Sequence, residues 1–594
     1  MVYYNVNMCL NTVLTSKGKI AMSDYTSEYK KWLTFEGLDG ELRKELEDIK
    51  DNEAEIKERF SFPLAFGTAG LRGIIRAGIN GMNVYTVAQA TQGLSELVKK
   101  SGGENRGVVI ATDTRIKSDV FSKVSAEVLS ANGIKVYVFD AERPTPELSF
   151  ALRHLGAIAG INITASHNPS IYNGYKAYWE DGAQISPEQA DIVSSEIGKV
   201  DIFTGAKRAP FEDGVKSGII EIIGREVDEE YINAVLAERI RPGVIPEVAE
   251  NFKVVYTPFH GAGRVLVPEV LRRAGVKNLY CVPEQMVPDG RFPTVKSPNP
   301  EDKEGFYLAI DIAKKENCDL LIGTDPDTDR VGVIVRSKDG EFIPLTGNQI
   351  GVMLISYIIE ARKKEGKLPA NACVVKSIVS TKLADEICKK NGVALVNVLT
   401  GFKFIGEKIK EYEASGEHTY IFGFEESYGY LSGTYARDKD AVCASLLITE
   451  MAAYYAEQGK NLYDVLNGIF EEYGYYAEQI GTIMLPGMDG LERMASLMDG
   501  LRKNPPEEIA GIPVECVADY KTEKVTYSDG KTEPTGLPKS NVLFYTLSNG
   551  DSVVIRPSGT EPKIKLYYLV SDETKEGSEN KIKIYKAAFE KLLG

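Results

Sequence analysis

The sequence lacks the features that mark several large classes of protein. Over its 594 residues no apolar run is long enough to cross a bilayer, so we expect no membrane span. Basic residues are the minority, with 70 Lys and Arg against 85 Asp and Glu and a formal charge of −15. Binding of nucleic acid through charge needs a basic surface, so nucleic acid is a poor candidate partner. An acidic chain can still bind phosphate groups through a few well-placed Arg, Lys and backbone N–H groups.

Cysteine is scarce and scattered. The chain has seven cysteines, an odd number, and no CxxC pair. In a chain of this length these features favour a reducing cytoplasm over a disulfide framework. The first 21 residues do not show the basic segment followed by an apolar segment that is typical of a secretory signal, and Met22 is a second possible start. We therefore expect a cytoplasmic protein with an N-terminal extension over residues 1–25.

The chain is too long for a single core, because cores stop growing near about 250–300 residues. After a helical stretch over residues 28–59, a similar α/β unit recurs three times: a short glycine turn joins a helix to a strand, and a later strand of the unit ends in a polar loop. The turns are marked by Gly133, Gly275 and Gly392. The strands before the polar loops are predicted over residues 157–163, 319–323 and 420–423. Ligands in such sheets bind beyond the carboxyl ends of strands, so we expect the three loops to converge on one cleft.

The first of these loops spans residues 164–169 (TASHNP) and places Ser166 beside His167. An apolar strand that ends in a small, polar loop is a way to present an exposed hydroxyl for chemistry. Lys176 follows a few residues later. The alternative is a Ser/Asn/Pro turn without chemistry.

The second loop carries Asp325, Asp327 and Asp329, which alternate directly after an apolar run. Three carboxylates this close repel one another unless a cation or solvent intervenes, and hard oxygen ligands suit Mg²⁺ or Ca²⁺. An EF-hand is excluded because Arg330 and Arg336 occupy its sixth and twelfth positions. A solvated acidic turn is the alternative.

Two further loops have features of ligand-binding segments. Residues 66–73 combine three glycines with Arg72, which indicates close backbone approach to a ligand, although a simple turn would look the same. Residues 556–562 (RPSGTEP) combine a guanidinium, two hydroxyls and a glycine, as in an anion cradle, without the spacing of a Walker A loop. The stretch after about residue 474 reads as a smaller α+β domain with a hairpin turn at Asn549 and Gly550.

Four motifs together resemble those of the α-D-phosphohexomutases in order and spacing. They are residues 164–169, 323–330, 424–429 and 556–562. Residues 67–73 (GTAGLRG) and 400–404 (TGFKF) add a resemblance to the long phosphoglucomutases, and the resemblance covers nearly all of the chain after about residue 25. It implies an α/β protein with three similar α/β domains with mixed sheets, and a C-terminal α+β domain similar to the TATA-binding-protein fold, around one central cleft. The domains are expected at residues 26–215, 216–332, 333–474 and 475–594.

The resemblance also implies a reaction. Ser166 is expected as phosphoserine, and with Asp325, Asp327 and Asp329 it is expected to hold Mg²⁺. Its phosphate would pass to O6 of glucose 1-phosphate, giving glucose 1,6-bisphosphate, whose 1-phosphate then returns to Ser166. The matching positions are Glu425 and Ser427 for the sugar hydroxyls, Arg556, Ser558, Gly559 and Thr560 for the non-reacting phosphate, and Arg72, His167, Lys176, Arg330 and Lys403 near the transferring group.

Other interpretations remain open from the sequence. Within the same family, the activity could be that of a phosphomannomutase or a phosphopentomutase. A haloacid-dehalogenase-type phosphatase would use Asp325 as its nucleophile, but this leaves Ser166 and residues 556–562 unexplained. A non-catalytic scaffold is a third reading, against which the intact Ser166 and Asp residues argue. The expected partner is a small phosphosugar, and the expected state is a monomer or weak homodimer.

Overall fold

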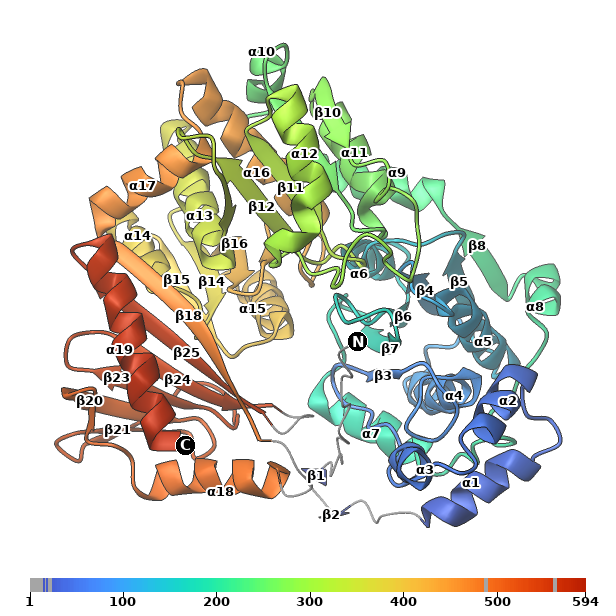
Figure 1. Ribbon diagram of the computed structural model, residues 1–594. Coiled ribbons are helices and arrows are strands. Elements are labelled where there is room, and N and C mark those ends of the chain that lie inside the picture. The colour runs from blue at the N-terminus through green and yellow to red at the C-terminus, as the bar shows by residue number, and fades with distance from the viewer. Residues whose placement is uncertain (1–13, 16–17, 20–23, 486–489, 559–562, 594) are drawn as a thin grey trace.

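The computed structural model describes residues 14–15, 18–19, 24–485, 490–558 and 563–593 (Figure 1). Two short strands, β1 (Leu14–Thr15) and β2 (Gly18–Lys19), pair near the N-terminus. Four larger sheets follow, each built from its own part of the chain, and Figure 1 shows them arranged around the centre of the molecule. In the part of the chain that the structure describes, no helix is long and apolar enough to cross a membrane.

The first helical stretch is three helices and not one. They are α1 (Tyr25–Thr34), α2 (Gly40–Asp48) and α3 (Glu53–Phe60). The helical stretch predicted over residues 28–59 is helical but divided, because Asp39 and Asn52 accept hydrogen bonds from backbone N–H groups that follow them. Such side chains start a new helix. Trp32 and Phe60 pack edge to face in the small core between these helices.

The first large sheet is mixed and holds the Ser166 loop. Its strands run in the order β3 (Leu71–Ile74), β7 (Tyr172–Trp179), β6 (Ala159–Ile163), β4 (Val108–Thr112), β5 (Val136–Phe139) and β8 (Ile220–Ile223). Strand β7 is antiparallel to β3 and β6, and the other neighbours are parallel. The helices of this unit are α4 (Val84–Lys100), α5 (Ser118–Ala131), α6 (Thr145–His154), α7 (Pro187–Ile197) and α8 (Phe211–Ser217).

The second sheet holds the acidic loop. Its order is β10 (Asn278–Cys281), β9 (Lys253–Thr257), β11 (Leu320–Thr324), β12 (Val331–Arg336) and β13 (Phe342–Leu345), with β10, β9 and β11 parallel and the others antiparallel. The surrounding helices are α9 (Arg225–Ala237), α10 (Val244–Val248), α11 (Gly263–Arg273), η1 (Lys303–Phe306) and α12 (Tyr307–Glu316).

The third sheet has the order β15 (Ala394–Val398), β14 (Ala372–Ser377), β16 (Thr419–Glu425) and β17 (Gly429–Leu431), and only β17 is antiparallel to its neighbour. Its helices are α13 (Gly347–Lys364), α14 (Leu383–Asn391), α15 (Phe402–Ser415), α16 (Ala441–Glu457) and α17 (Leu462–Tyr473). Helix α16 is apolar on all sides and packs against α10 and α11 as well as α13. The second and third units therefore share one hydrophobic core.

The C-terminal sheet has a separate core. Its main path is β18 (Tyr475–Met484), β25 (Lys563–Asp572), β24 (Ser552–Pro557), β23 (Leu543–Leu547), β20 (Ile512–Asp519), β21 (Lys524–Tyr527) and β22 (Thr532–Pro534), with β19 (Glu508–Ile509) beside β20. Helices α18 (Gly490–Lys503) and α19 (Lys575–Leu593) belong to this unit. The predicted hairpin at Asn549 and Gly550 is confirmed as β23–β24.

The sheets suggest where the domain boundaries lie. Strand β8 joins the first sheet and β13 joins the second, although the sequence-based ranges would give these strands to the following domains. We propose boundaries after Ile223, Leu345 and Tyr473. The predicted fold class, three α/β units with mixed sheets and a C-terminal sheet-rich unit, is confirmed.

Candidate active site

Ser166 lies at the carboxyl end of β6, a central strand of the first sheet. Its side chain is 3% exposed, so the expectation of an exposed hydroxyl is wrong: the acidic loop of the second unit covers it. The Ser166 Oγ donates a hydrogen bond to Asp325 Oδ2 at 2.9 Å and lies 3.3 Å from His167 Nδ1. The backbone of Ser166 has φ +54°, a left-handed conformation that is uncommon outside glycine.

The three carboxylates after β11 form a buried cluster, with ligand atoms within 4.8 Å of one another. Asp325 Oδ1 accepts hydrogen bonds from the backbone N–H groups of Asp329 and Arg330 at 3.1 and 3.0 Å, which fixes the turn of the loop. Asp327 Oδ1 and Asp329 Oδ1 are buried and accept no hydrogen bond from any described residue. Buried acceptors without a donor are costly, and a bound cation would satisfy them.

Two lysines balance part of this negative charge. Lys176 Nζ lies 2.7 Å from Asp327 Oδ2 and 3.5 Å from Asp329 Oδ2. Lys439 Nζ lies 3.1 Å from Asp329 Oδ2 and 3.0 Å from Asp438 Oδ1. Lys439 was not among the residues predicted from the sequence. The signal available there was a run of four alternating charges, residues 437–440, directly before an apolar helix.

Burial and charge act in opposite directions on these groups. Burial raises the pKa of Asp325 well above its usual range, and the Asp327 carboxylate raises it further. Burial would also raise the pKa of Asp327, but Lys176 above all, followed by Asp325 and Lys439, outweighs it and lowers that pKa. The pKa of His167 lies well below its usual range because of burial and the nearby Arg330 and Arg72.

Thr145, at the start of α6, connects the first unit to the acidic loop. Its backbone N–H donates to the Asp327 carbonyl at 2.8 Å, and its hydroxyl donates to Asp327 Oδ2 at 2.9 Å. Asn162 on β6 donates to the Thr145 hydroxyl at 2.7 Å. The carboxylate is thus oriented by groups that no local sequence motif revealed.

The third unit contributes Glu425 from the last residue of β16, where the strand runs two residues beyond its predicted end. The side chain is 5% exposed, and its Oε1 accepts a hydrogen bond from the Gly401 N–H at 2.7 Å. Burial, and secondly the Glu426 carboxylate, raise the pKa of Glu425 to about 7. Lys403 lies in the first turn of α15, and burial lowers its pKa. Ser427 is half-buried in the loop that follows Glu425.

The loop after Glu425 is tied to the acidic loop through the backbone. Tyr428 has φ +66°, and its carbonyl accepts a hydrogen bond from the Val331 N–H at 3.1 Å. Val331 begins the strand that leaves the acidic loop. Arg330, just before it, lies 3.4 Å from Glu301 and 3.7 Å from Asp329.

The C-terminal unit brings Arg556 to the same region. Arg556 lies on β24 beside Lys565, and its charge lowers the pKa of Glu426 in the third unit, against the larger effect of burial. The Ser558 N–H donates to the Lys563 carbonyl at 2.8 Å, which closes the base of the predicted anion cradle. Gly559 and Thr560 lie outside the described residues.

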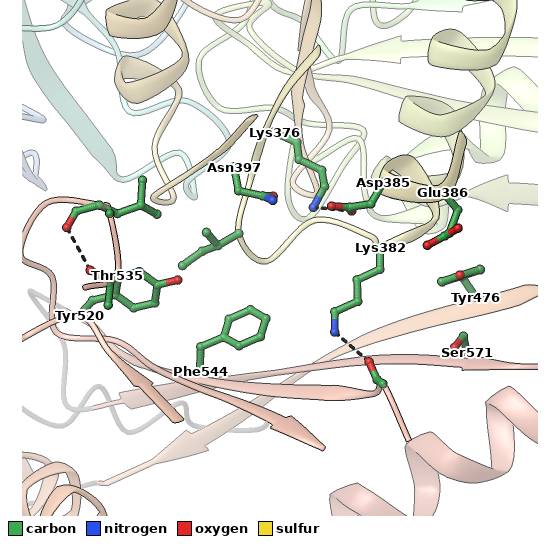
Figure 2. Close-up of a pocket in the computed structure, with 14 residues that line it drawn as sticks. Lys376, Lys382, Asp385, Glu386, Asn397, Tyr476, Tyr520, Thr535, Phe544 and Ser571 are labelled. Carbon is green, nitrogen blue, oxygen red and sulfur yellow. Dashed lines mark hydrogen bonds and ion pairs between the residues drawn. The ribbon is translucent and has the colours of Figure 1, made fainter. Parts of the chain in front are cut away.

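A cavity of about 610 Å³ lies between the third unit and the C-terminal sheet, and none of the residues that line it belongs to the acidic cluster. Figure 2 shows Lys376 and Lys382 of the third unit on one side and Tyr520 and Phe544 of the C-terminal sheet on the other. Lys382 spans the gap and donates to the Gly550 carbonyl at 2.8 Å and to the hydroxyl of Ser552, the first residue of β24, at 2.7 Å. This contact anchors the strand that carries Arg556.

Comparison with known families identifies three segments of the chain. Residues 63–202, 229–340 and 346–473 match the phosphoglucomutase/phosphomannomutase alpha/beta/alpha domains I, II and III, in that order. Asp325 lies in the segment that matches domain II. The alternative of a haloacid-dehalogenase-type phosphatase is not supported by these matches.

Curated relatives cover most of the chain. A phosphoglucomutase of Staphylococcus aureus (strain MRSA252) is 37% identical over 525 residues, which is 87% of this chain and 91% of that protein. A phosphoglucomutase of Staphylococcus haemolyticus (strain JCSC1435) is 37% identical over 512 residues, 86% of this chain and 91% of that protein.

Solved structures share the fold. The phosphoprotein pp63/parafusin (a phosphoglucomutase) from Paramecium, in an open form, has a TM-score of 0.65 at 16% identity and covers 88% of this chain and 94% of its own. A phosphoglucomutase/phosphomannomutase family protein from Burkholderia thailandensis has a TM-score of 0.62 at 18% identity, over 89% and 97% of the two chains. With three matching domains and relatives at 37% identity over most of its length, the chain belongs to the phosphoglucomutase/phosphomannomutase family of phosphohexomutases.

Proposed function

We propose that this protein interconverts glucose 1-phosphate and glucose 6-phosphate, with Ser166 as the carrier of the phosphoryl group. The observation that carries the proposal is the Ser166 hydroxyl 2.9 Å from Asp325 in a buried acidic cluster. A nucleophile beside a site for a cation is the arrangement that phosphoryl transfer requires. The choice of glucose rests on the Staphylococcus relatives, which are named phosphoglucomutases.

We propose Mg²⁺ as the cation, held by Asp325, Asp327, Asp329 and an oxygen on Ser166. The two buried carboxylate oxygens without donors support this, and so does the all-oxygen ligand set, which suits a hard cation. When bound, the ion neutralises charge on the transferring phosphoryl group. The protein's own contribution is orientation: Thr145 and Lys176 both hold Asp327, and Lys439 holds Asp329.

We propose that residues of the third and C-terminal units bind the sugar phosphate. Glu425 and Ser427 would contact the ring hydroxyls, while Arg556 and Ser558 would bind the phosphate that is not reacting. Arg330 and Arg72 are close enough to His167 to lower its pKa, which supports roles for these three residues near the transferring group. For Lys403 the same role is proposed from the motif at residues 400–404 alone. In the first half-reaction the Ser166 Oγ–P bond breaks and an O6–P bond forms. In the second, after the bisphosphate has reoriented, the O1–P bond breaks and the Ser166 Oγ–P bond forms again. The proton that O6 gives up in the first transfer is matched by the one that O1 takes up in the second.

A glucose 1-phosphate assay in the presence of glucose 1,6-bisphosphate tests the proposal directly. We expect formation of glucose 6-phosphate, and peptide mapping should find one phosphate on Ser166. A strong preference for ribose 1-phosphate would show that the hexose assignment is wrong. Phosphate on Asp325 with release of inorganic phosphate would show that the protein is a hydrolase.

The Arg556→Ala variant is expected to weaken the apparent affinity for phosphosugars by about 10- to 100-fold, because a hydrogen bond to a charged group contributes about 1.5–3 kcal/mol. Phosphorylation of Ser166 by glucose 1,6-bisphosphate should survive better than the full cycle, since bond breaking occurs at the other end of the site. Steady-state KM and kcat are the measurements. Arg502→Ala, in the same unit but paired with Asp519, is the matched control. Unaltered kinetics in Arg556→Ala would contradict the proposed role of Arg556 in binding the phosphate that is not reacting.

The Glu425→Gln variant is expected to depress activity on glucose 1-phosphate and mannose 1-phosphate by a similar factor, about tenfold or more. The bisphosphate must bind in two orientations, and O3 and O4 lie between its two phosphates, so one carboxylate can hold them in both. Glucose and mannose differ only at C2, and without a buried contact to O2 discrimination is weak. We expect glucose 1-phosphate to be the better substrate, with measurable activity on mannose 1-phosphate.

The control for this comparison is Glu411→Gln on the exposed face of α15, which should leave both activities unchanged. If Glu425→Gln lost activity on one of the two sugar phosphates and kept it on the other, this loop would be shown to distinguish the configuration at C2.

We further propose a cytoplasmic location and a monomeric or weakly dimeric state. The six cysteines in the described ranges are free, which supports a reducing compartment. Sedimentation analysis at several protein concentrations would test the oligomeric state.

A further inference from the structure

A buried ion pair lies directly behind the Ser166 loop. Asp113 and Arg115 follow β4, the strand beside β6, so their side chains and the Ser166 loop emerge at the same edge of the sheet. Both side chains are fully buried, and Arg115 Nε lies 3.2 Å from Asp113 Oδ2. No sequence motif pointed to this pair.

The Arg115 guanidinium is directed at the Ser166 loop. Its terminal nitrogens donate to four backbone carbonyls there, those of Ser166, Asn168, Pro169 and Tyr172. The last two contacts are 2.9 and 3.0 Å long. Phe292, from the loop between β10 and η1, lies against the guanidinium, with its ring centre 5.1 Å away. One guanidinium thus binds four backbone carbonyls of the same loop.

Asp113 completes the support through a second path. Its Oδ2 accepts a 2.6 Å hydrogen bond from the Thr164 hydroxyl, and that hydroxyl accepts one from the Ser166 N–H at 2.9 Å. Its Oδ1 accepts from the Arg115 N–H and from the Ser118 hydroxyl, at 2.9 and 3.1 Å. Both the N–H and the carbonyl of Ser166 are therefore fixed by this ion pair, the first through Thr164 and the second by Arg115 itself.

The conformation that is fixed in this way is an unfavourable one. A serine at φ +54° is held in the left-handed region only where surrounding contacts determine it. Without them the loop would relax and move Oγ from its position 2.9 Å from Asp325. A displacement of about 1 Å at a reacting atom is enough to cost about 100-fold in rate.

We propose that Arg115, together with Asp113, is a positioning residue for the phosphoryl transfer: it holds the Ser166 backbone in the conformation that aims Oγ at the acidic cluster. The inference rests on the proposed function of Ser166 as phosphoryl carrier. Arg115 contacts the loop from behind and binds its backbone, so it acts through Ser166. Its loss should reduce kcat much more than it changes KM for the sugar phosphate.

The test compares Arg115→Gln, Arg115→Lys and Asp113→Asn with a matched control, Arg59→Gln. Arg59 also forms a buried ion pair, with Glu45 and Glu55, but in the helices α2 and α3. We expect Arg115→Gln to lower kcat about 100-fold with KM changed less than about threefold. Arg115→Lys should recover part of kcat, because an ammonium keeps the charge and up to three donors. Arg59→Gln should lower the melting temperature while kcat stays at the wild-type value.

Phosphorylation of Ser166 separates this inference from the proposed function. After incubation with glucose 1,6-bisphosphate, intact mass and peptide mapping give the phosphorylation rate of each variant. A slow rate in Arg115→Gln against a normal rate in Arg59→Gln would support positioning. If the wild type is phosphorylated on Ser166 and Arg115→Gln matches it in rate and kcat, the inference is overturned and the proposed function stands.

Three further outcomes are decisive. If Arg115→Gln and Arg59→Gln lose kcat in proportion to their loss of melting temperature, Arg115 is only structural and the inference fails. If Arg115→Gln does not fold, Asp113→Asn and Arg115→Lys decide: a wild-type kcat in both overturns the inference, and a fall of about tenfold or more at unchanged KM supports it. A wild type without phosphate on Ser166 would instead overturn the proposed function.

Discussion

Replacing Ser166 with alanine is expected to lower turnover of glucose 1-phosphate by on the order of 10⁴-fold or more, the scale of removing a covalent nucleophile. The fold should survive. The hydroxyl makes a 2.9 Å hydrogen bond with Asp325, and loss of one such bond costs about 1–3 kcal/mol. A coupled assay for glucose 6-phosphate measures the activity, and intact mass should show no phosphate after incubation with glucose 1,6-bisphosphate.

The matched control is Ser125→Ala on α5. Ser125 is fully buried and its hydroxyl bonds the Phe121 carbonyl at 2.9 Å, away from the acidic cluster. This variant should keep both turnover and the phosphate on Ser166. Retained turnover in Ser166→Ala, with phosphate found on Asp325, would contradict the assignment of the nucleophile.

Asp327→Ala is expected to reduce activity by at least about 100-fold and to abolish its dependence on Mg²⁺, since loss even of a residue that only supports a metal ligand costs 10–100-fold. The change also leaves Lys176 without its 2.7 Å partner. Metal binding has a second readout in stability. At a Mg²⁺ concentration 100 times Kd, the wild type should gain about 2.7 kcal/mol, seen as a rise in melting temperature. The variant should show no such rise.

Asp319→Asn is the control for this experiment. Asp319 stands just before β11, at the opposite end of the strand from the acidic loop, and its side chain is exposed. It should behave as wild type in both the activity and the melting assays. Full wild-type activity after exhaustive chelation would end the metal hypothesis.

Most of the fold could be predicted because its strands are short apolar runs that end in polar loops. The strand predicted over residues 319–323 is β11 at Leu320–Thr324, and the strand predicted over residues 157–163 is β6 at Ala159–Ile163. The periodicity of the sequence did not reveal the contacts between the units. Helix α16 is apolar on every side, and only its packing against α10, α11 and α13 shows that the second and third units share a core.

The candidate site was predictable only where chemistry is concentrated in a motif. Ser166 and the three Asp stand in compact loops whose residue types suggest their role. The burial of Ser166 was not predictable, because the loop that covers it comes from another unit about 160 positions later, a separation no local pattern of residues encodes. Three other residues of the site were not predicted for a similar reason: Lys439, Thr145 and Arg115. Each lies in a stretch without a recognisable motif and contacts the site only through residues far away in the sequence.

The backbone hydrogen bond between Val331 and Tyr428 joins the loop of acidic residues to the loop of Glu425, and a second bond runs from the Ala441 N–H to the Thr328 carbonyl at 3.2 Å. The two loops therefore share a main-chain hydrogen bond that no side-chain substitution removes. The free-energy effects of substitutions at Asp327 and Glu425 should consequently not add in a double-mutant cycle, although the two residues come from different sheets. If the third unit contacts the sugar and the acidic loop holds the metal, as proposed, this constrains the evolution of sugar preference: a new sugar contact on the third unit would be selected together with its effect on the acidic loop of the second.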